Sequence, residues 1–152
     1  MTPGPINRAV VADKTALIRR LLDAARTLPL EDLDAFTADP RMVAAGESYL
    51  RRALEALLDL ARHVLAKGFA RGPAEYAEVA RQLGEVGVVT GQQSQRLVLM
   101  ARYRNRLVHV YHQVTDAELY ELLTQRLRDI EEMLGAIAIW MARHPDRCGD
   151  GE

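Results

Sequence analysis

The feature that most constrains the fold is a regular spacing of apolar residues near the end of the chain. Between residues 116 and 143, apolar side chains recur every three or four positions: Leu119, Leu123, Leu127, Ile130, Leu134, Ile137 and Met141. This spacing aligns them on one stripe of a long α-helix, as in the core of a helical bundle and, in some proteins, at a dimer interface. The sequence therefore predicts a helix over residues 116–143.

The rest of the chain shows the same helical pattern. Apolar positions predict helices over residues 7–27 and 40–67. The second helix would begin with Asp39 as N-cap and Pro40 at the first helical position, and it would end at Gly68. Shorter helices are expected at 30–36 and 74–83. Thr90 with Gln93, and Thr115 with Glu118, match the capping-box pattern that begins a helix. We expect an all-α fold, an antiparallel up-and-down bundle of four main helices plus short helices.

Length and composition indicate one domain. A chain of 152 residues with 49% apolar content can build one well-formed core, but is short for two. We expect a helical domain over residues 1–143 and a flexible polar tail over 144–152. The only cysteine, Cys148, has no disulfide partner, and neither a signal peptide nor an apolar run long enough for a membrane span is recognisable. These observations favour a cytoplasmic location.

Positive charge is concentrated in one segment. The formal net charge is −1, yet residues 86–115 contain four arginines and no acidic residue: Arg96, Arg102, Arg104 and Arg106. Such asymmetry favours an anionic ligand, for example a phosphate group. The alternative is that acidic residues from other helices fold over the segment and neutralise it.

Within this segment, Arg104, Asn105, His109 and Tyr111 form an Arg-x4-His-x-Tyr pattern. On an ideal helix Arg104 and Tyr111 share a stripe, whereas Arg104 and His109 point about 140° apart. Either the helix distorts near His109, or a second surface brings both groups onto one substrate. Arg104 also lies on an otherwise apolar stripe, so its guanidinium needs an anion, a group of carbonyls or a wet cleft.

These residue types suit RNA cleavage without a metal. His109 and His112 lack nearby carboxylates that would complete a metal site. Patterns typical of a Ser/His/Asp triad, a cysteine nucleophile or a phosphate-binding glycine loop are not evident in the sequence. We therefore expect neither a metal nor a cofactor. RNA supplies its own nucleophile, the 2′-hydroxyl. His109 can move protons near neutral pH, and Arg104 can stabilise the phosphorane. Asn105 can orient the imidazole or form a hydrogen bond to the phosphate.

At these residues the chain resembles the HEPN superfamily, and most closely its HepT-like toxin branch. The similarity extends to residues 40–64, 73–89 and 116–134. The resemblance implies a homodimer whose two motifs face each other, metal-independent endoribonuclease activity that leaves a 2′,3′-cyclic phosphate, and a nucleotidyltransferase antitoxin of the MNT type as partner. That antitoxin would transfer AMP from ATP onto Tyr111 and neutralise the toxin.

Two alternatives stay open at this point. The chain could be a non-catalytic HEPN module that binds a nucleotide or the nucleotidyltransferase, or a helical dimer that acts only as a scaffold. Arg102, Arg106 and His112 are candidates for RNA binding, although each could equally face solvent.

Overall fold

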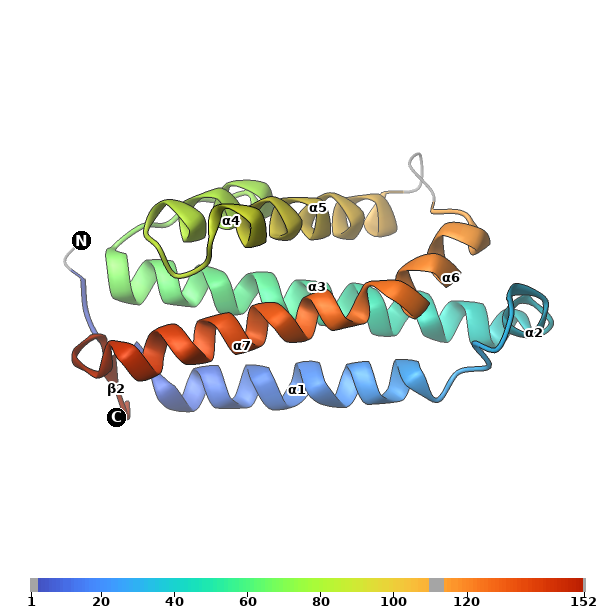
Figure 1. The fold of residues 1–152 in the computed structure, drawn as a ribbon, viewed down its shortest axis with the longest axis horizontal. Coiled ribbons are helices and arrows are strands. Elements are labelled where there is room, and N and C mark those ends of the chain that lie inside the picture. The colour runs from blue at the N-terminus through green and yellow to red at the C-terminus, as the bar shows by residue number, and fades with distance from the viewer. Residues whose placement is uncertain (1–2, 110–113, 152) are drawn as a thin grey trace.

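The structure, a computed structural model, describes residues 3–109 and 114–151. Its long helices alternate in direction: α1 (Arg8–Arg26), α3 (Pro40–Phe69), α5 (Gly91–Val108), and the consecutive pair α6 (Asp116–Gln125) and α7 (Leu127–Arg143) (Figure 1). The short helices α2 (Leu33–Thr37) and α4 (Tyr76–Glu85) complete the bundle. The expected all-α, up-and-down bundle of four main helices plus short ones is confirmed.

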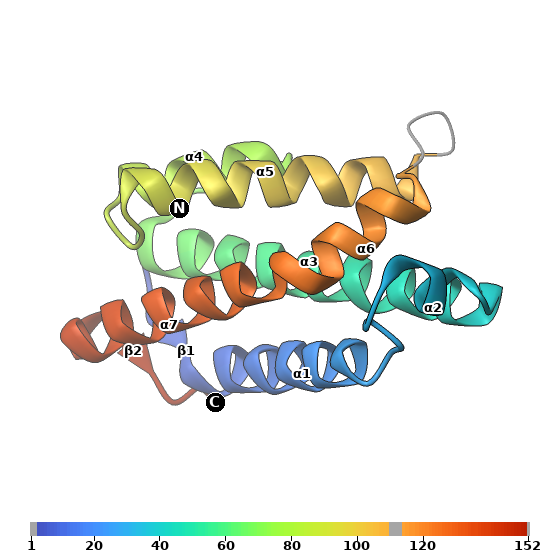
Figure 2. The same ribbon diagram turned by 45° about the vertical axis from the view of Figure 1, so that its right-hand side comes forward.

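Helix α3 lies at the centre of the bundle. Figure 2 shows α4 and α5 on one side of it and α1 on the other, while α7 runs between α5 and α1. The consecutive residues Leu57 and Leu58, and then Leu60 and Ala61, are fully buried, so α3 is covered around most of its circumference. A helix buried in this way is apolar on nearly all sides because it contacts neighbours in several directions.

Helices α2 and α4 begin three and two residues later than expected. Two other differences affect the packing, and the first is at Gly68. Helix α3 continues through Gly68 to Phe69, and Ala70 ends it in the left-handed conformation with φ of 54°. Gly68 is needed for packing instead, because a Cβ there would lie 2.9 Å from Cδ1 of Ile6. The glycine therefore marks close packing of α3 against Ile6 of the N-terminal segment rather than the end of the helix.

The second difference is a break in the expected helix over residues 116–143. Arg126, with φ of −111° and ψ of −7°, separates α6 from α7. The bend lets α6 pack against α2 and α3 while α7 follows α1, α3 and α5 (Figure 2). Leu123 and Leu127 are buried on either side of the break, so the stripe of apolar residues continues across it although the helix axis changes direction.

Residues 144–151, for which a flexible tail is expected, fold back onto the start of the chain. A 3₁₀ turn, η2 (Pro145–Arg147), leads to β2 (Cys148–Gly149), which pairs in parallel with β1 (Ile6–Asn7). The guanidinium of Arg147 donates a hydrogen bond to the carbonyl oxygen of Gly68. Over the described ranges, the structure has no helix with the length and apolar character needed to cross a bilayer.

Candidate functional site

Helix α5 carries the first part of the predicted motif and ends just before His109. Its start has the predicted capping box, in which Thr90 and Gln93 exchange side-chain and backbone hydrogen bonds. At the other end His109 is extended, with φ of −95° and ψ of 119°, and its N–H donates to the carbonyl oxygen of Asn105 at 3.1 Å. The helix therefore ends after Val108, and helical spacing indicates no direction for the residues that follow His109. Tyr111 and His112 lie outside the described residues.

Arg104 finds the anion that its place on an apolar stripe requires. Its Nε donates to Oε1 of Glu55 on α3 at 3.3 Å, and Arg51 donates to the same oxygen at the same distance. The guanidinium carbon of Arg104 also lies 4.9 Å from the ring centre of Tyr76 on α4, a cation–π distance. Arg104 is therefore held by two other helices.

The ring of Tyr76 is itself fixed in place. Its hydroxyl donates to Oδ1 of Asp59 at 2.8 Å, and the guanidinium carbon of Arg62 lies 4.7 Å from the ring centre. Burial raises the pKa of Tyr76, and the hydrogen bond to Asp59 raises it further. The phenol therefore keeps its proton near neutral pH and provides an uncharged platform for Arg104.

Arg104 retains hydrogen-bonding capacity for a ligand. Besides the bond from Nε to Glu55, its Nη1 donates to Oδ1 of Asn105 at 3.3 Å. A guanidinium has five N–H donors, so these two bonds leave three for a phosphate group. The side chain of Asn105 accepts this bond from Arg104, and its backbone carbonyl accepts the N–H of His109.

His109 lies at a different place from Arg104. It is exposed and lines a pocket of about 360 Å³ formed by α3, the end of α5 and the start of α6. The α3 residue in this pocket is Glu47, which precedes the Arg104 partner Glu55 by eight positions, about 12 Å along the helix. Arg104 does not line the pocket, so within one chain the structure does not bring Arg104 and His109 together.

Arg106 closes a bidentate ion pair across this end of the bundle. Its Nη1 and Nη2 donate to the two carboxylate oxygens of Glu118 at 2.8 and 2.9 Å. The pair lowers the pKa of Glu118 and raises that of Arg106. Thr115 caps α6 by accepting from the N–H of Glu118, but the Glu118 carboxylate turns to Arg106, so the second predicted capping box is only half formed.

Acidic residues from other helices neutralise most of the basic segment. Arg96 pairs with Glu132, as Arg104 pairs with Glu55 and Arg106 with Glu118. Arg102 is exposed, and it makes no ion pair with any residue that the structure describes. Three of the four arginines are therefore neutralised by acidic residues of other helices, which is the alternative stated for this segment. A phosphate ligand would have to share these arginines with the carboxylates or displace the carboxylates.

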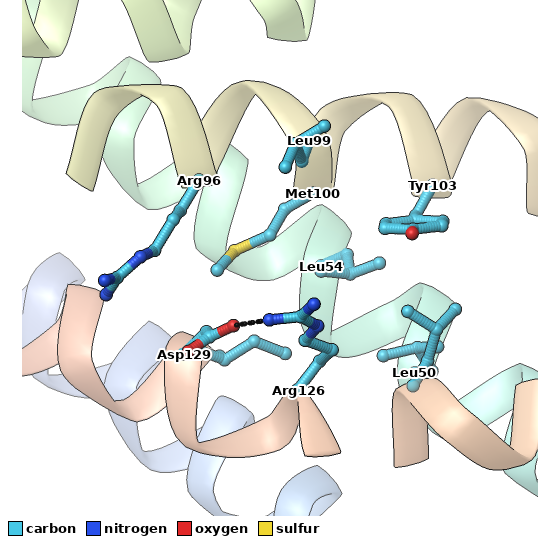
Figure 3. Close-up of a pocket in the computed structure, with 10 residues that line it drawn as sticks. Leu50, Leu54, Arg96, Leu99, Met100, Tyr103, Arg126 and Asp129 are labelled. Atoms are coloured by element: carbon cyan, nitrogen blue, oxygen red, sulfur yellow. Dashed lines mark ion pairs between the residues drawn. The ribbon is translucent and has the colours of Figure 1, made fainter. Parts of the chain in front are cut away.

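A second depression lies between α5, α3 and the α6–α7 break, and its lining is mostly apolar (Figure 3). Its volume of about 60 Å³ is far below the ~300–1,000 Å³ of typical small-molecule sites. The charged groups at its edge are paired, Arg126 with Asp129 at 3.5 Å and Arg96 with Glu132. This depression is therefore a poorer candidate for a nucleotide site than the pocket beside His109.

Sequence reasoning missed the acidic and aromatic partners of the motif. Glu55 and Tyr76 lie on helices remote in sequence, and the only local signal was the four-residue spacing of Arg51 and Glu55, which favours an ion pair on one helix face. Glu47 and Asp116 gave no signal. The described residues contain no group of three or more His, Cys, Asp or Glu side chains arranged to hold a metal ion.

Comparison with known proteins gives the same fold and a family. The family model described as "Ribonuclease HepT-like" matches residues 17–137, which include the whole motif. No curated protein is significantly similar to the chain in sequence.

Several solved structures have a similar fold. One, a toxin–antitoxin complex with AMP-PNP, has a chain 21% identical with a TM-score of 0.78, covering 87% of this chain and 99% of its own. Another, a tri-AMPylated HEPN toxin from Shewanella oneidensis in complex with MNT antitoxin, is 22% identical with a TM-score of 0.77, covering 86% and 97%. A third, YutE from Bacillus subtilis, described as a cytosolic protein of unknown function, is 17% identical with a TM-score of 0.77, covering 95% and 97%.

Proposed function

The chain belongs to the ribonuclease HepT-like family, and from this premise we propose that it is the toxin of a toxin–antitoxin pair, a metal-independent endoribonuclease. The observation that carries the proposal is the motif on α5 within a family match that spans it. Arg104 is held firmly yet keeps donors for a phosphate, and His109 lies exposed at the helix end. This combination suits proton transfer beside an anion.

In the proposed reaction the 2′-hydroxyl of RNA is the nucleophile. His109 accepts the 2′-hydroxyl proton while the 2′ oxygen attacks phosphorus, and Arg104 stabilises the negative charge of the phosphorane. The bond to the 5′ oxygen then breaks, and that oxygen takes up the proton. The products are a 2′,3′-cyclic phosphate and a 5′-hydroxyl end, so atoms and charge balance without water or a metal ion.

The active unit in this proposal is a homodimer. Arg104 of one chain contacts α3 and α4 near Glu55, while His109 of the same chain lines a different pocket. A two-fold arrangement places the α5 ends of two copies opposite each other, so that Arg104 of one protomer and His109 of its partner act on the same phosphate. This resolves the separation of the two groups within one chain.

The partner in this proposal is an MNT-type nucleotidyltransferase antitoxin in the cytoplasm. A solved neighbour is described as an AMPylated HEPN toxin in complex with MNT antitoxin, which supports the same regulation here. The antitoxin would transfer AMP from ATP onto the Tyr111 hydroxyl with release of pyrophosphate. The added adenylyl group brings negative charge and bulk close to the motif, where it would compete for the arginines.

The proposed nuclease activity is tested with His109→Ala and, as control, Gln95→Ala, which changes an exposed residue of α5. Loss of a general acid/base lowers the cleavage rate by about 10²- to 10⁴-fold, whereas Gln95→Ala should cleave like the wild type. Both variants should keep the helical circular dichroism signal. Equal cleavage by His109→Ala and wild type, purified in parallel, would overturn the assignment.

The rival function is a non-catalytic HEPN module that binds a nucleotide or the nucleotidyltransferase. It is distinguished by growth on expression: a toxin arrests growth and His109→Ala relieves the arrest, whereas a binding module has neither effect. Regulation is tested by intact mass and peptide mapping after expression with and without an MNT-type nucleotidyltransferase partner. Addition of AMP at Tyr111 only with the partner supports the proposal, and Tyr111→Phe should abolish it.

A further inference from the structure

The pocket beside His109 contains two acidic side chains next to apolar ones, an unusual lining for a site that handles a polyanion. Glu47 from α3 and Asp116 from the start of α6 contribute the carboxylates, and Val108, Val114 and Leu119 contribute apolar surface. We propose that this pocket is a base-binding subsite that selects guanine in the nucleotide next to the cleaved phosphate. The inference rests on the proposed function and adds a substrate preference to it.

The size and walls of the pocket suit a planar base. Its volume of about 360 Å³ falls in the ~300–1,000 Å³ range of small-molecule sites. Proteins that read RNA sequence commonly take an unstacked base into a pocket, cover its faces with apolar or aromatic side chains and bind its edge by hydrogen bonds. Here the side chain of Val108, 39% exposed, offers apolar surface directly beside His109.

The charge of the described lining disfavours phosphate as the occupant of the pocket. Among the lining residues that the structure describes, the arginine is Arg106, which is already bound through two hydrogen bonds to Glu118. Glu47 and Asp116 are exposed, and neither forms an ion pair with any residue in the described ranges 3–109 and 114–151. The two carboxylates therefore favour a ligand group that presents hydrogen-bond donors and no negative charge.

Guanine satisfies this requirement best. Its Watson–Crick edge carries N1–H and the N2 amino group side by side, which form a fork that one carboxylate can accept with both oxygens. Adenine and cytosine each offer one amino group, beside a ring nitrogen that a carboxylate repels, and uracil offers a single N–H. Carboxylates likewise accept hydrogen bonds from base amino groups in duplex recognition. The pocket thus holds the base while His109 at its rim stays free for the 2′-hydroxyl.

Binding of mononucleotides tests the subsite without relying on cleavage. Titration with 3′-GMP should perturb the NMR signals of His109 and Val114 and bind about 5- to 150-fold more tightly than 3′-UMP, the discrimination typical of one bidentate pair. Glu47→Gln and Asp116→Asn preserve size and remove the charge, so at least one should abolish the preference. Glu31→Gln, an exposed residue between α1 and α2, is the control and should keep it.

Cleavage supplies a second readout. Four RNAs that differ in one central nucleotide should be cut fastest at guanine, and the Glu47→Gln or Asp116→Asn variant should lose this preference while still cutting RNA. Cleavage without preference, or a guanine preference that survives both substitutions, overturns the inference but leaves the proposed function intact. Absence of cleavage of every RNA, with selective 3′-GMP binding intact, overturns the nuclease proposal and supports the subsite.

Discussion

Replacing Glu55 with alanine removes the carboxylate that holds Arg104. Oε1 of Glu55 accepts hydrogen bonds from both Arg104 and Arg51 at 3.3 Å, and the side chains of Glu55 and Arg104 are 26% and 27% exposed. Without Glu55, the guanidinium keeps its stacking on Tyr76 and its bond to Asn105 but loses the charged anchor on α3. Arg104 would then sample orientations in which it no longer faces the scissile phosphate.

The size of this effect follows from the geometry. A hydrogen bond to a charged group contributes about 1.5–3 kcal/mol when well formed, and exposed ion pairs contribute about 0–1 kcal/mol. A distance of 3.3 Å and partial exposure place the Glu55–Arg104 anchor between these limits, at about 1–2 kcal/mol. If that free energy is spent on orienting Arg104, Glu55→Ala should lower kcat by about 5- to 30-fold.

The assay is steady-state cleavage of a fluorescent RNA, with a double-mutant cycle against Arg104→Ala. Glu55→Gln keeps a carbonyl oxygen as acceptor, so it should retain more activity than Glu55→Ala. In the Arg104→Ala background, Glu55→Ala should have no further effect on kcat. An undiminished kcat for Glu55→Ala, or an equal loss in both backgrounds, would refute a positioning role for Glu55.

Two further predictions concern stability. Gly46→Ala should lower the unfolding free energy by about 1 kcal/mol, because the new Cβ would lie 2.7 Å from Cδ1 of Leu123. Gly135→Ala, with open space around it, should raise the unfolding free energy by about 0.5–1 kcal/mol. Urea unfolding of both variants checks this, and equal changes in the unfolding free energy would contradict it. His63 accepts the N–H of Asn7 on its Nε2, and burial lowers its pKa. Neutral His63 therefore stabilises the fold above its unfolded pKa of about 6.5, and this contribution disappears as the pH falls through the lower folded pKa. His63→Gln should flatten the fall in stability between about pH 7.5 and 5.5, and an unchanged slope would exclude His63 as its cause.

Most helices could be predicted because their signals are local. Asp39 with Pro40, and Thr90 with Gln93, begin α3 and α5 as the sequence indicates. The break at Arg126 has no local signal, because neither glycine nor proline is present and the apolar spacing of Leu123 and Leu127 continues across it. The bend arises from packing of α6 and α7 on different neighbours, which periodicity does not encode.

The candidate site was only partly predictable for the same reason. The sequence indicated that Arg104 requires an anion, but Glu55 and Tyr76 come from α3 and α4, and their contact with Arg104 depends on how the helices pack. Arg104 and His109 lie in different surroundings, as their spacing on a helix predicts, but the spacing could not be used further along the chain because α5 ends at Val108. Helical spacing predicts directions only as far as the helix extends.

The central claim is that each active site uses Arg104 of one protomer and His109 of its partner. Mixing Arg104→Ala with His109→Ala tests it most directly, because neither homodimer has an intact site. With random exchange, half of the dimers are mixed and each has one intact site of two, so about a quarter of wild-type cleavage should return. If each site lies within one chain, no mixture contains an intact site. Activity that stays at the level of the separate variants, in dimers shown to have exchanged, would contradict the account.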